Sequence, residues 1–285
     1  MFLFSYIYNT LVLYMNHLLE MLFTLIVLLG SLKGTTNPQS FSELTDNVKG
    51  KEGDFGIYIK DLKTQQIYEY NSELLVNGAS LFKVPVGVAT LKAMELGLVK
   101  SGDEVTLEGS DFSSGSGVFN TYPAGSKVLL KDVLSQLIYS SDNTAQQMLM
   151  RTIPDWVIKG GFDLNKSLTG KSDFYHRDIT SAKEFGIYLE ELYFGEYLGV
   201  SDRDYLVTLM SKTLFDDRVT PYIGDGLVFA HKIGNDPEGA GWHDCGIVLE
   251  PPRTAKAVVC VTSRGVIYQE FLEVCRWIGE FVGTI

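Results

Sequence analysis

Hydrophobic and polar residues alternate near both ends of the chain, which is the pattern of half-buried strands. Residues 55–62 alternate in this way, and 66–70 come after a turn at Lys63-Thr64, so the two segments predict a hairpin. Strand patterns return at 228–233, 246–249 and 255–262. Helices are predicted at both edges of this region, one at 41–48 with Ser40 as its N-cap and an amphipathic one at 267–282.

The middle of the chain has a helical period instead. From Ser80 onward, apolar residues recur every three or four positions, and the early position of Pro85 suits the first turns of a helix with Ser80 in its first turn. Four further helices are predicted, at 130–139, 144–152, 181–194 and 202–212.

This order of elements predicts the fold class. Strands at both ends around a helical middle indicate one sheet built from distant parts of the chain, which is an α/β (α+β) architecture with an all-helical insertion. We expect a sheet domain at 35–79 and 215–285 and a helical domain at 80–214. With 285 residues, 45% of them hydrophobic, the chain is long enough to bury one large core or two closely packed subdomains.

The first 32 residues are apolar apart from a few polar positions, and Glu20 is their one charged residue. We interpret 1–34 as an export signal or a membrane anchor, the anchor being formed by 1–32. Either alternative places the rest of the chain outside the cytoplasm, secreted or membrane-bound. A buried N-terminal core helix is the competing interpretation.

Charge excludes one class of partner. The net charge is −11 and no basic run occurs, so the electrostatic attraction on which nucleic-acid binding depends is missing. The four histidines lack metal-binding spacing, and we expect no metal and no cofactor. His231 is interpreted as a strand-edge residue.

The three cysteines, Cys245, Cys260 and Cys275, do not form a disulfide framework, and packing thiols are the simplest interpretation. There is one alternative. Cys245 and Cys260 lie symmetrically about a turn at 251–253, so a hairpin would place them opposite each other as a disulfide.

Candidate chemistry begins at Ser80, because a serine hydroxyl needs a base within hydrogen-bond reach. Lys83 is three residues later, on the same face of a helix. The S-x-x-K spacing alone is expected about once by chance in a chain of this length. Two further motifs give it context: Ser141-Asp142-Asn143 after an apolar helix, and His231-Lys232-Ile233-Gly234 on a strand.

In order and spacing, these motifs resemble those of class A β-lactamases and penicillin-binding proteins, and the likeness covers nearly all of the chain after residue 34. The resemblance implies an antiparallel sheet flanked by helices, and a monomer that acts on a β-lactam or a peptidoglycan stem peptide. It also implies roles: nucleophile for Ser80, base for Lys83, proton relay for Ser141, substrate contact for Asn143, carboxylate attraction for Lys232. The oxyanion hole would combine the Ser80 N–H with that of Asn235 or Asp236, just after Gly234. Arg218 is either an addition to the carboxylate site or a surface arginine.

The chain departs from this family in two places. Class A enzymes deacylate with a glutamate on the loop before the position of Asp178, and residues 160–177 contain none. Asp163 and Asp173 are candidate replacements, although loop and capping roles suit them equally. Ile233 stands where the family has a hydroxyl residue. Tyr122, in the helical middle, is a core or cleft-wall residue with a gate as the alternative.

Three functions are compatible with these residues. The first is a class A β-lactamase-like hydrolase that forms an acyl-Ser80 ester with β-lactam antibiotics and hydrolyses it. The second is a D,D-carboxypeptidase or penicillin-binding protein, favoured by the missing glutamate. The third is a noncatalytic cell-envelope binding protein, against which the intact Ser80, Lys83, Ser141, Asn143 and Lys232 argue.

Overall fold

The structure is a computed structural model that describes residues 40–165 and 173–285. All of these residues belong to one compact unit, Pro38–Ile285. The predicted export signal or anchor at 1–34 lies outside the described residues. Within the described part, no helix has the length and apolar character needed to cross a membrane.

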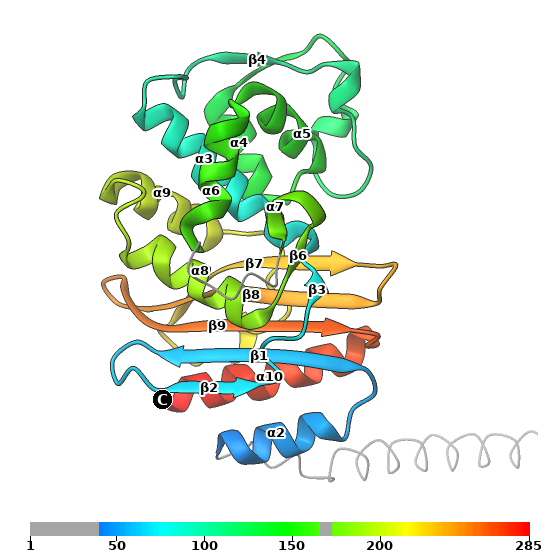
Figure 1. Cartoon of the computed structure of the whole chain (residues 1–285), viewed down its shortest axis with the longest axis vertical. Helices are drawn as coiled ribbons and strands as arrows, with labels where there is room; N and C mark the ends of the chain where they lie inside the picture. The colour runs from blue at the N-terminus through cyan, green and yellow to red at the C-terminus, as the bar shows by residue number, and fades with distance from the viewer. Residues whose placement is uncertain (1–39, 166–172) are drawn as a thin grey trace, which may run out of the picture. The chain divides into compact units, whose positions relative to one another are not determined.

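A five-stranded antiparallel sheet crosses the lower half of the view in Figure 1. Its strand order is β2-β1-β9-β8-β7, so strands from the N-terminal part pair with strands from the C-terminal part, as the sequence predicted. The strands are β1 (Asp54–Asp61), β2 (Ile67–Tyr70), β7 (Val228–Asp236), β8 (Gly241–Glu250) and β9 (Thr254–Arg264). β8 begins five residues earlier than predicted, because it pairs with β7 along the whole length of that strand.

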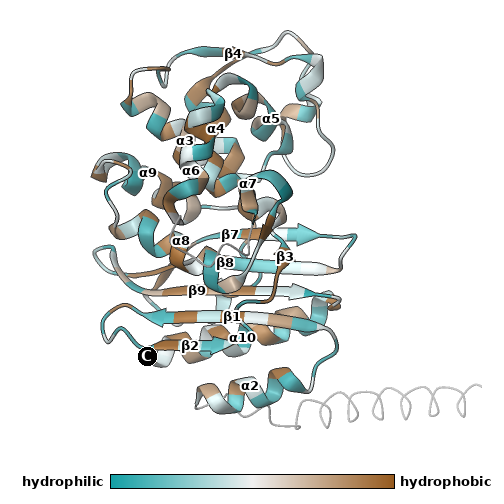
Figure 2. Ribbon diagram, in the orientation of Figure 1, coloured by the Kyte–Doolittle hydropathy of each residue, from teal (hydrophilic) through white to brown (hydrophobic). Residues whose placement is uncertain are grey.

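Alternating side chains of the sheet enter two different cores. Ile57 and Ile59 of β1 pack in one core with helices α2 (Phe41–Lys49) and α10 (Tyr268–Thr284), whereas Tyr58 belongs to the opposite core. Figure 2 shows hydrophobic stretches along β9. Ser40 caps α2 as predicted, since its hydroxyl accepts from Glu43 N and the Glu43 carboxylate accepts from Ser40 N.

The second core joins the other face of the sheet to the helical region. Helix α3 lies inside this region, and most of its residues are buried. Helix α8 packs directly on β1, β8 and β9. The predicted domain limits, 80 and 214, stay predictions. The remaining helices are α3 (Lys83–Glu95), α4 (Leu130–Tyr139), α5 (Asn143–Thr152), α6 (Asp155–Phe162), α7 (Phe174–Arg177), α8 (Ala182–Phe194) and α9 (Val200–Met210).

Short elements complete the fold and include two two-stranded ribbons, β3–β6 and β4–β5. The β3–β6 ribbon matters most for the position of Ser80, because the chain passes from β3 straight into the turn that carries this serine. The strands are β3 (Val76–Asn77), β4 (Glu104–Thr106), β5 (Lys127–Leu129) and β6 (Ile179–Thr180), and the 3-10 turns are η1 (Ala79–Phe82), η2 (Gly109–Asp111), η3 (Phe119–Thr121), η4 (Asp163–Asn165) and η5 (Thr220–Tyr222).

Cys245 and Cys260 form the disulfide that was the alternative to packing thiols. Cys245 of β8 and Cys260 of β9 are opposite each other in the strand register, with their Cα atoms 4.0 Å apart, and they form a disulfide. The packing-thiol interpretation was therefore wrong for this pair, because the antiparallel register brings the two Cβ atoms together. Cys275 is a buried free thiol.

Candidate active site

Ser80 lies on a 3-10 turn and not in the first turn of an α-helix, which begins only at Lys83. The prediction of a helix start at Ser80 was wrong by three residues. The backbone shows the reason: the Lys83 N–H bonds to Ser80 O, three residues back, so the chain first forms a tighter 3-10 turn, which follows a left-handed Ala79 with φ +50°. The Asn77 side chain stabilises this turn, since its Oδ1 accepts from Ala79 N at 2.9 Å. Pro85 is the third residue of α3, where its missing N–H is tolerated.

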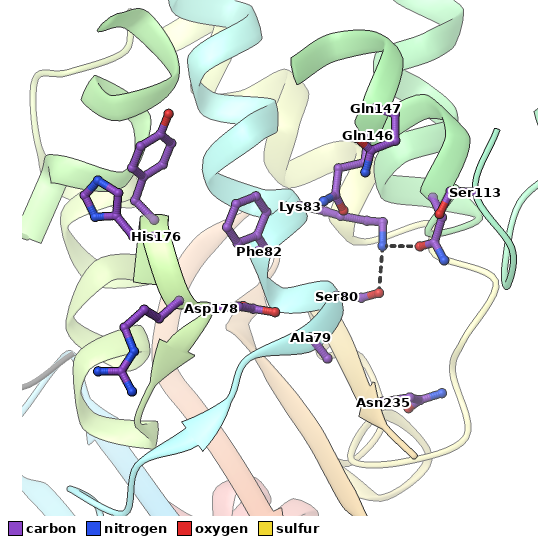
Figure 3. A pocket seen from close by; sticks show the side chains of 13 residues that line it. Ala79, Ser80, Phe82, Lys83, Ser113, Gln146, Gln147, His176, Asp178 and Asn235 are labelled. Carbon is purple, nitrogen blue, oxygen red and sulfur yellow. Dashed lines mark hydrogen bonds between the residues drawn. The ribbon is translucent and has the colours of Figure 1, made fainter. Parts of the chain in front are cut away.

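Lys83 is the direct partner of the Ser80 hydroxyl. Its Nζ lies 2.7 Å from Ser80 Oγ and 2.8 Å from Asn143 Oδ1 (Figure 3). The Asn143 amide also donates to Ser114 O at 2.6 Å, so the loop at 113–116 and helix α5 meet at this lysine. Burial lowers the pKa of Lys83 to about 8, against the opposing effects of the Asp142 and Asp178 carboxylates. A substantial fraction of Lys83 is therefore neutral near pH 8 and able to accept a proton.

Ser141 and Lys232 form a second pair. Lys232 Nζ donates to Ser141 Oγ at 2.9 Å, and the lysine is fully buried. Burial, with the nearby positive charges of Lys83 and Arg218, lowers the pKa of Lys232 well below its ordinary value. Asp142, the middle residue of the Ser141 motif, has a structural role, because its carboxylate accepts from Ala145 N and caps α5.

Ser80, Lys83 and Asn143 line a cavity of about 600 Å³ (Figure 3), whereas Ser141 and Lys232 are not among its lining residues in the described chain. Polar groups dominate its wall. The residues that line it are Ala79, Ser80, Phe82, Lys83, Ser113, Asn143, Gln146, Gln147, Tyr175, His176, Arg177, Asp178 and Asn235.

Arg218 is buried, 2% exposed, so its interpretation as a surface arginine was wrong. Its guanidinium donates to Gly234 O at 3.2 Å, to His243 O and to Asn235 Oδ1. These acceptors explain the burial, because a charged group enters a protein interior only when hydrogen bonds replace its water. Arg218 thus supports the end of β7 that forms one side of the cavity.

Gly234 is required by close packing. A Cβ at this position would lie 2.7 Å from Gly78 O and 2.8 Å from the His243 ring, so a larger residue would push the Ser80 turn away from the sheet. Ile233 is buried and supplies no hydroxyl to the site. Gly234 and Ile233 are not among the cavity-lining residues of the described chain.

Sequence analysis did not identify His243. This fully buried residue of β8 places its Nε2 2.7 Å from Asn77 O, while its Nδ1 accepts from Ser263 N at 3.3 Å. Nε2 is therefore the protonated nitrogen, and burial lowers the pKa of His243 to about 4. The neutral ring ties the central sheet to the segment just before Ser80. No sequence motif signals such a contact, which spans 166 residues.

His231 is buried, although β7 is an edge strand. Its Nδ1 lies 2.6 Å from Asp244 Oδ1, and its Nε2 lies 3.7 Å from Asp216 Oδ1. Burial opposes the charge, but the two carboxylates outweigh it and raise the pKa of His231 to about 9. His231 is thus a buried, charged residue of β7, next to Lys232 in the sequence. Its contacts with Asp244 and Asp216 give it a structural role.

The two candidate replacements for the glutamate have other positions. Asp173 caps α7 through His176 N, which is the capping role. Asp163 lies in η4, and neither residue is among those that line the cavity in the described chain. Tyr122 lines a different hollow with Phe119 and is not among the described residues that line the Ser80 cavity.

The sequence comparison used Asp178 only to mark the end of the loop that lacks a glutamate. The structure places Asp178 among the residues that line the Ser80 cavity. It has φ +53°, a conformation that Asp tolerates, and it ends α7. Burial raises the pKa of Asp178 to about 7, against the opposing effects of the Ala79 N–H and the Lys83 ammonium.

Known proteins share this fold. Two solved structures, "Structure of PBP-A" and a PBP-A mutant described as an acyl-enzyme complex with penicillin-G, each have a TM-score of 0.75 and 21% identity, over 86% of this chain and 94% of theirs. A beta-lactamase from Sphaerobacter thermophilus has a TM-score of 0.72 and 20% identity, over 86% of this chain and 97% of its own.

At such identities, these structures show the likeness of the fold. No curated protein sequence matches the chain. A family model, described as the beta-lactamase enzyme family, matches residues 39–282. This match covers almost all of the described residues, and its limits agree with the unit that contains the Ser80 cavity. The chain belongs to the beta-lactamase enzyme family.

Proposed function

We propose that this chain opens the amide of a β-lactam by attack of Ser80 Oγ, forms an acyl-Ser80 ester and hydrolyses it. The observation that carries the proposal is the contact between a buried lysine and the hydroxyl: Lys83 Nζ lies 2.7 Å from Ser80 Oγ. Because the pKa of Lys83 is lowered to about 8, its neutral amine can take the hydroxyl proton as Oγ attacks. The PBP-A acyl-enzyme with penicillin-G supports β-lactams as the substrate class.

The second half of acyl transfer needs a proton on the departing nitrogen. Ser141 suits this step, because its hydroxyl accepts from Lys232 and its own proton is free to pass to the substrate. The Ser80 N–H and the N–H of Asn235 or Asp236 would stabilise the negative oxygen. Lys232, which the resemblance implies attracts a substrate carboxylate, is fully buried with a lowered pKa, so we assign its Nζ the role of hydrogen-bond donor to Ser141.

A D,D-carboxypeptidase is the second candidate, and one observation favours it. Residues 160–177 contain no glutamate, the residue with which class A β-lactamases hydrolyse the ester. The similarity to PBP-A agrees with this candidate. Its substrate would be the D-Ala-D-Ala end of a stem peptide, attacked by the same Ser80.

We also propose that the protein acts outside the cytoplasm. The Cys245–Cys260 disulfide supports this location, because such bonds persist in oxidising compartments. The apolar segment at 1–32 supports it independently.

Intact-mass measurement of the full chain mixed with benzylpenicillin tests the function, with Ser80→Ala as the control. A Ser80-dependent adduct that disappears as penicilloate accumulates is the expected result. An adduct that persists, together with release of D-alanine from a D-Ala-D-Ala peptide, selects the peptidase. A folded wild-type chain that forms no adduct and cleaves no peptide overturns both and leaves the noncatalytic envelope protein.

A further inference from the structure

Asp178 is the one carboxylate among the described residues that line the Ser80 cavity. Asp178 lies between the end of α7 and the start of β6. Its backbone is held on both sides: Asp178 N donates to Phe174 O at 3.2 Å, and Asp178 O accepts from Gly78 N at 2.7 Å. The second bond joins it directly to the turn that carries the nucleophile.

The side chain of Asp178 has few partners. Within residues 40–165 and 173–285, its Oδ1 is buried without a hydrogen-bond partner. Buried polar atoms of native proteins nearly always have a partner, so an unpartnered carboxylate oxygen in a residue that lines the cavity needs a reason. Figure 3 shows the side chain beside Phe82, against the turn that carries Ala79 and Ser80.

We propose that Asp178 activates the water that hydrolyses the acyl-Ser80 ester. This inference rests on the proposed function and names the group that takes the place of the missing loop glutamate. Asp178 and Ser80, which would carry the ester, line the same cavity.

In this step a water proton moves to an Asp178 carboxylate oxygen while the water oxygen bonds to the ester carbonyl carbon. The bond between that carbon and Ser80 Oγ then breaks. The proton taken up by Asp178 returns to Ser80 Oγ through Lys83, whose Nζ lies 2.7 Å from that Oγ. Water is added across the ester, and nothing is oxidised or reduced.

The electrostatic surroundings suit this role. Burial, with the Asp236 carboxylate as a lesser contribution, raises the pKa of Asp178, and the Ala79 N–H and Lys83 oppose the rise, so the pKa is about 7. The other titratable groups at the cavity are Tyr175, His176 and Arg177, all of α7. A base with a pKa near the working pH combines a large ionised fraction with useful proton affinity.

The test is the intact-mass time course with benzylpenicillin on wild type and Asp178→Asn, with Asp173→Asn as the matched control. Asn keeps the size of the side chain and removes the base. We expect all three to acylate at similar rates and Asp178→Asn alone to lose its adduct about 10²- to 10⁴-fold more slowly. Wild-type release should rise with pH through about 7, and this rise should be missing from Asp178→Asn.

Hydroxylamine provides a second measurement, because it attacks the ester carbon without a general base and leaves a hydroxamate. It should release the acyl group from Asp178→Asn as fast as from wild type. The inference is overturned if Asp178→Asn releases its adduct in water at the wild-type rate, if Asp178→Asn fails to acylate, or if the wild-type adduct persists. In these cases the wild-type adduct still forms, so the proposed acylation stands. A wild type without any adduct overturns the proposed function itself.

Discussion

Lys232 Nζ donates a hydrogen bond to Ser141 Oγ at 2.9 Å, across 91 residues of sequence. The bond joins an edge strand of the sheet to the turn between α4 and α5, so the sheet and the helical region meet at this contact. Both partners are buried, which keeps the bond away from competing water.

Ser141→Ala should slow acylation about 10²- to 10⁴-fold, because the departing nitrogen loses its proton donor. The rate of benzylpenicillin adduct formation measures the effect. Ser140→Ala is the matched control, since the neighbouring hydroxyl bonds only to Gln136 in the described structure. Equal acylation by Ser141→Ala and wild type would remove Ser141 from the mechanism.

Acylation should accelerate with pH and level off above about 8. Burial lowers the pKa of Lys83 to about 8, and only the neutral amine, which predominates above that pH, accepts the Ser80 proton. Rates of adduct formation between pH 6 and 10 provide the profile. A profile that is flat from pH 7 to 9 would show that Lys83 is not the base.

His231 should make the fold less stable in alkali. Its pKa is raised to about 9 in the folded protein, above its ordinary 6.5, so its stabilisation is complete below pH 6.5 and is lost as pH rises through 9. The loss should be on the order of 1–3 kcal/mol in urea unfolding. His231→Gln should remove this pH dependence, whereas the exposed His176→Gln should retain it. A wild-type stability that is constant between pH 6.5 and 9 is incompatible with a charged His231.

His243 is expected to be a positioning residue. His243→Leu loses the bond to Asn77 O and should slow acylation about tenfold to a hundredfold, because the Ser80 turn loses its tie to the sheet. His243→Gln offers an amide donor in the same direction and should recover much of the rate. If both variants lose stability equally and acylate equally, His243 contributes only to the core.

Reduction of the Cys245–Cys260 disulfide should lower the free energy of unfolding by about 3 kcal/mol, the value expected for a loop of roughly 15 residues. Urea unfolding with and without dithiothreitol measures the difference. Cys275→Ala should respond to dithiothreitol as wild type does. An unchanged midpoint on reduction would mean that the bond does not constrain the unfolded chain.

Local patterns predicted the strands, the principal helices and the adjacency of Ser80 and Lys83, because spacing along a chain directly determines which residues share a face. They did not predict the 3-10 turn of Ala79–Phe82, with its left-handed Ala79, which delays the start of the α-helix to Lys83. Backbone conformation at one alanine depends on the Asn77 bond and on the sheet beneath the turn.

The sequence did not predict the contacts between segments that are distant along the chain. His243 and the buried Arg218 stand in no recognisable motif, and Asp178 was used only to mark a family position, whereas the fold brings each of them into contact with a distant segment. The motif order identified the family and thereby the expected partners of Ser80, but a family pattern says nothing of residues that this chain uses differently.

Peptide mapping after exposure of the full chain to benzylpenicillin tests the central claim most directly. We predict that one peptide, the one containing Ser80, carries the added mass, and that Ser80→Ala carries none. Added mass on another residue, or none on a folded wild-type chain, would contradict the assignment of Ser80 as the nucleophile.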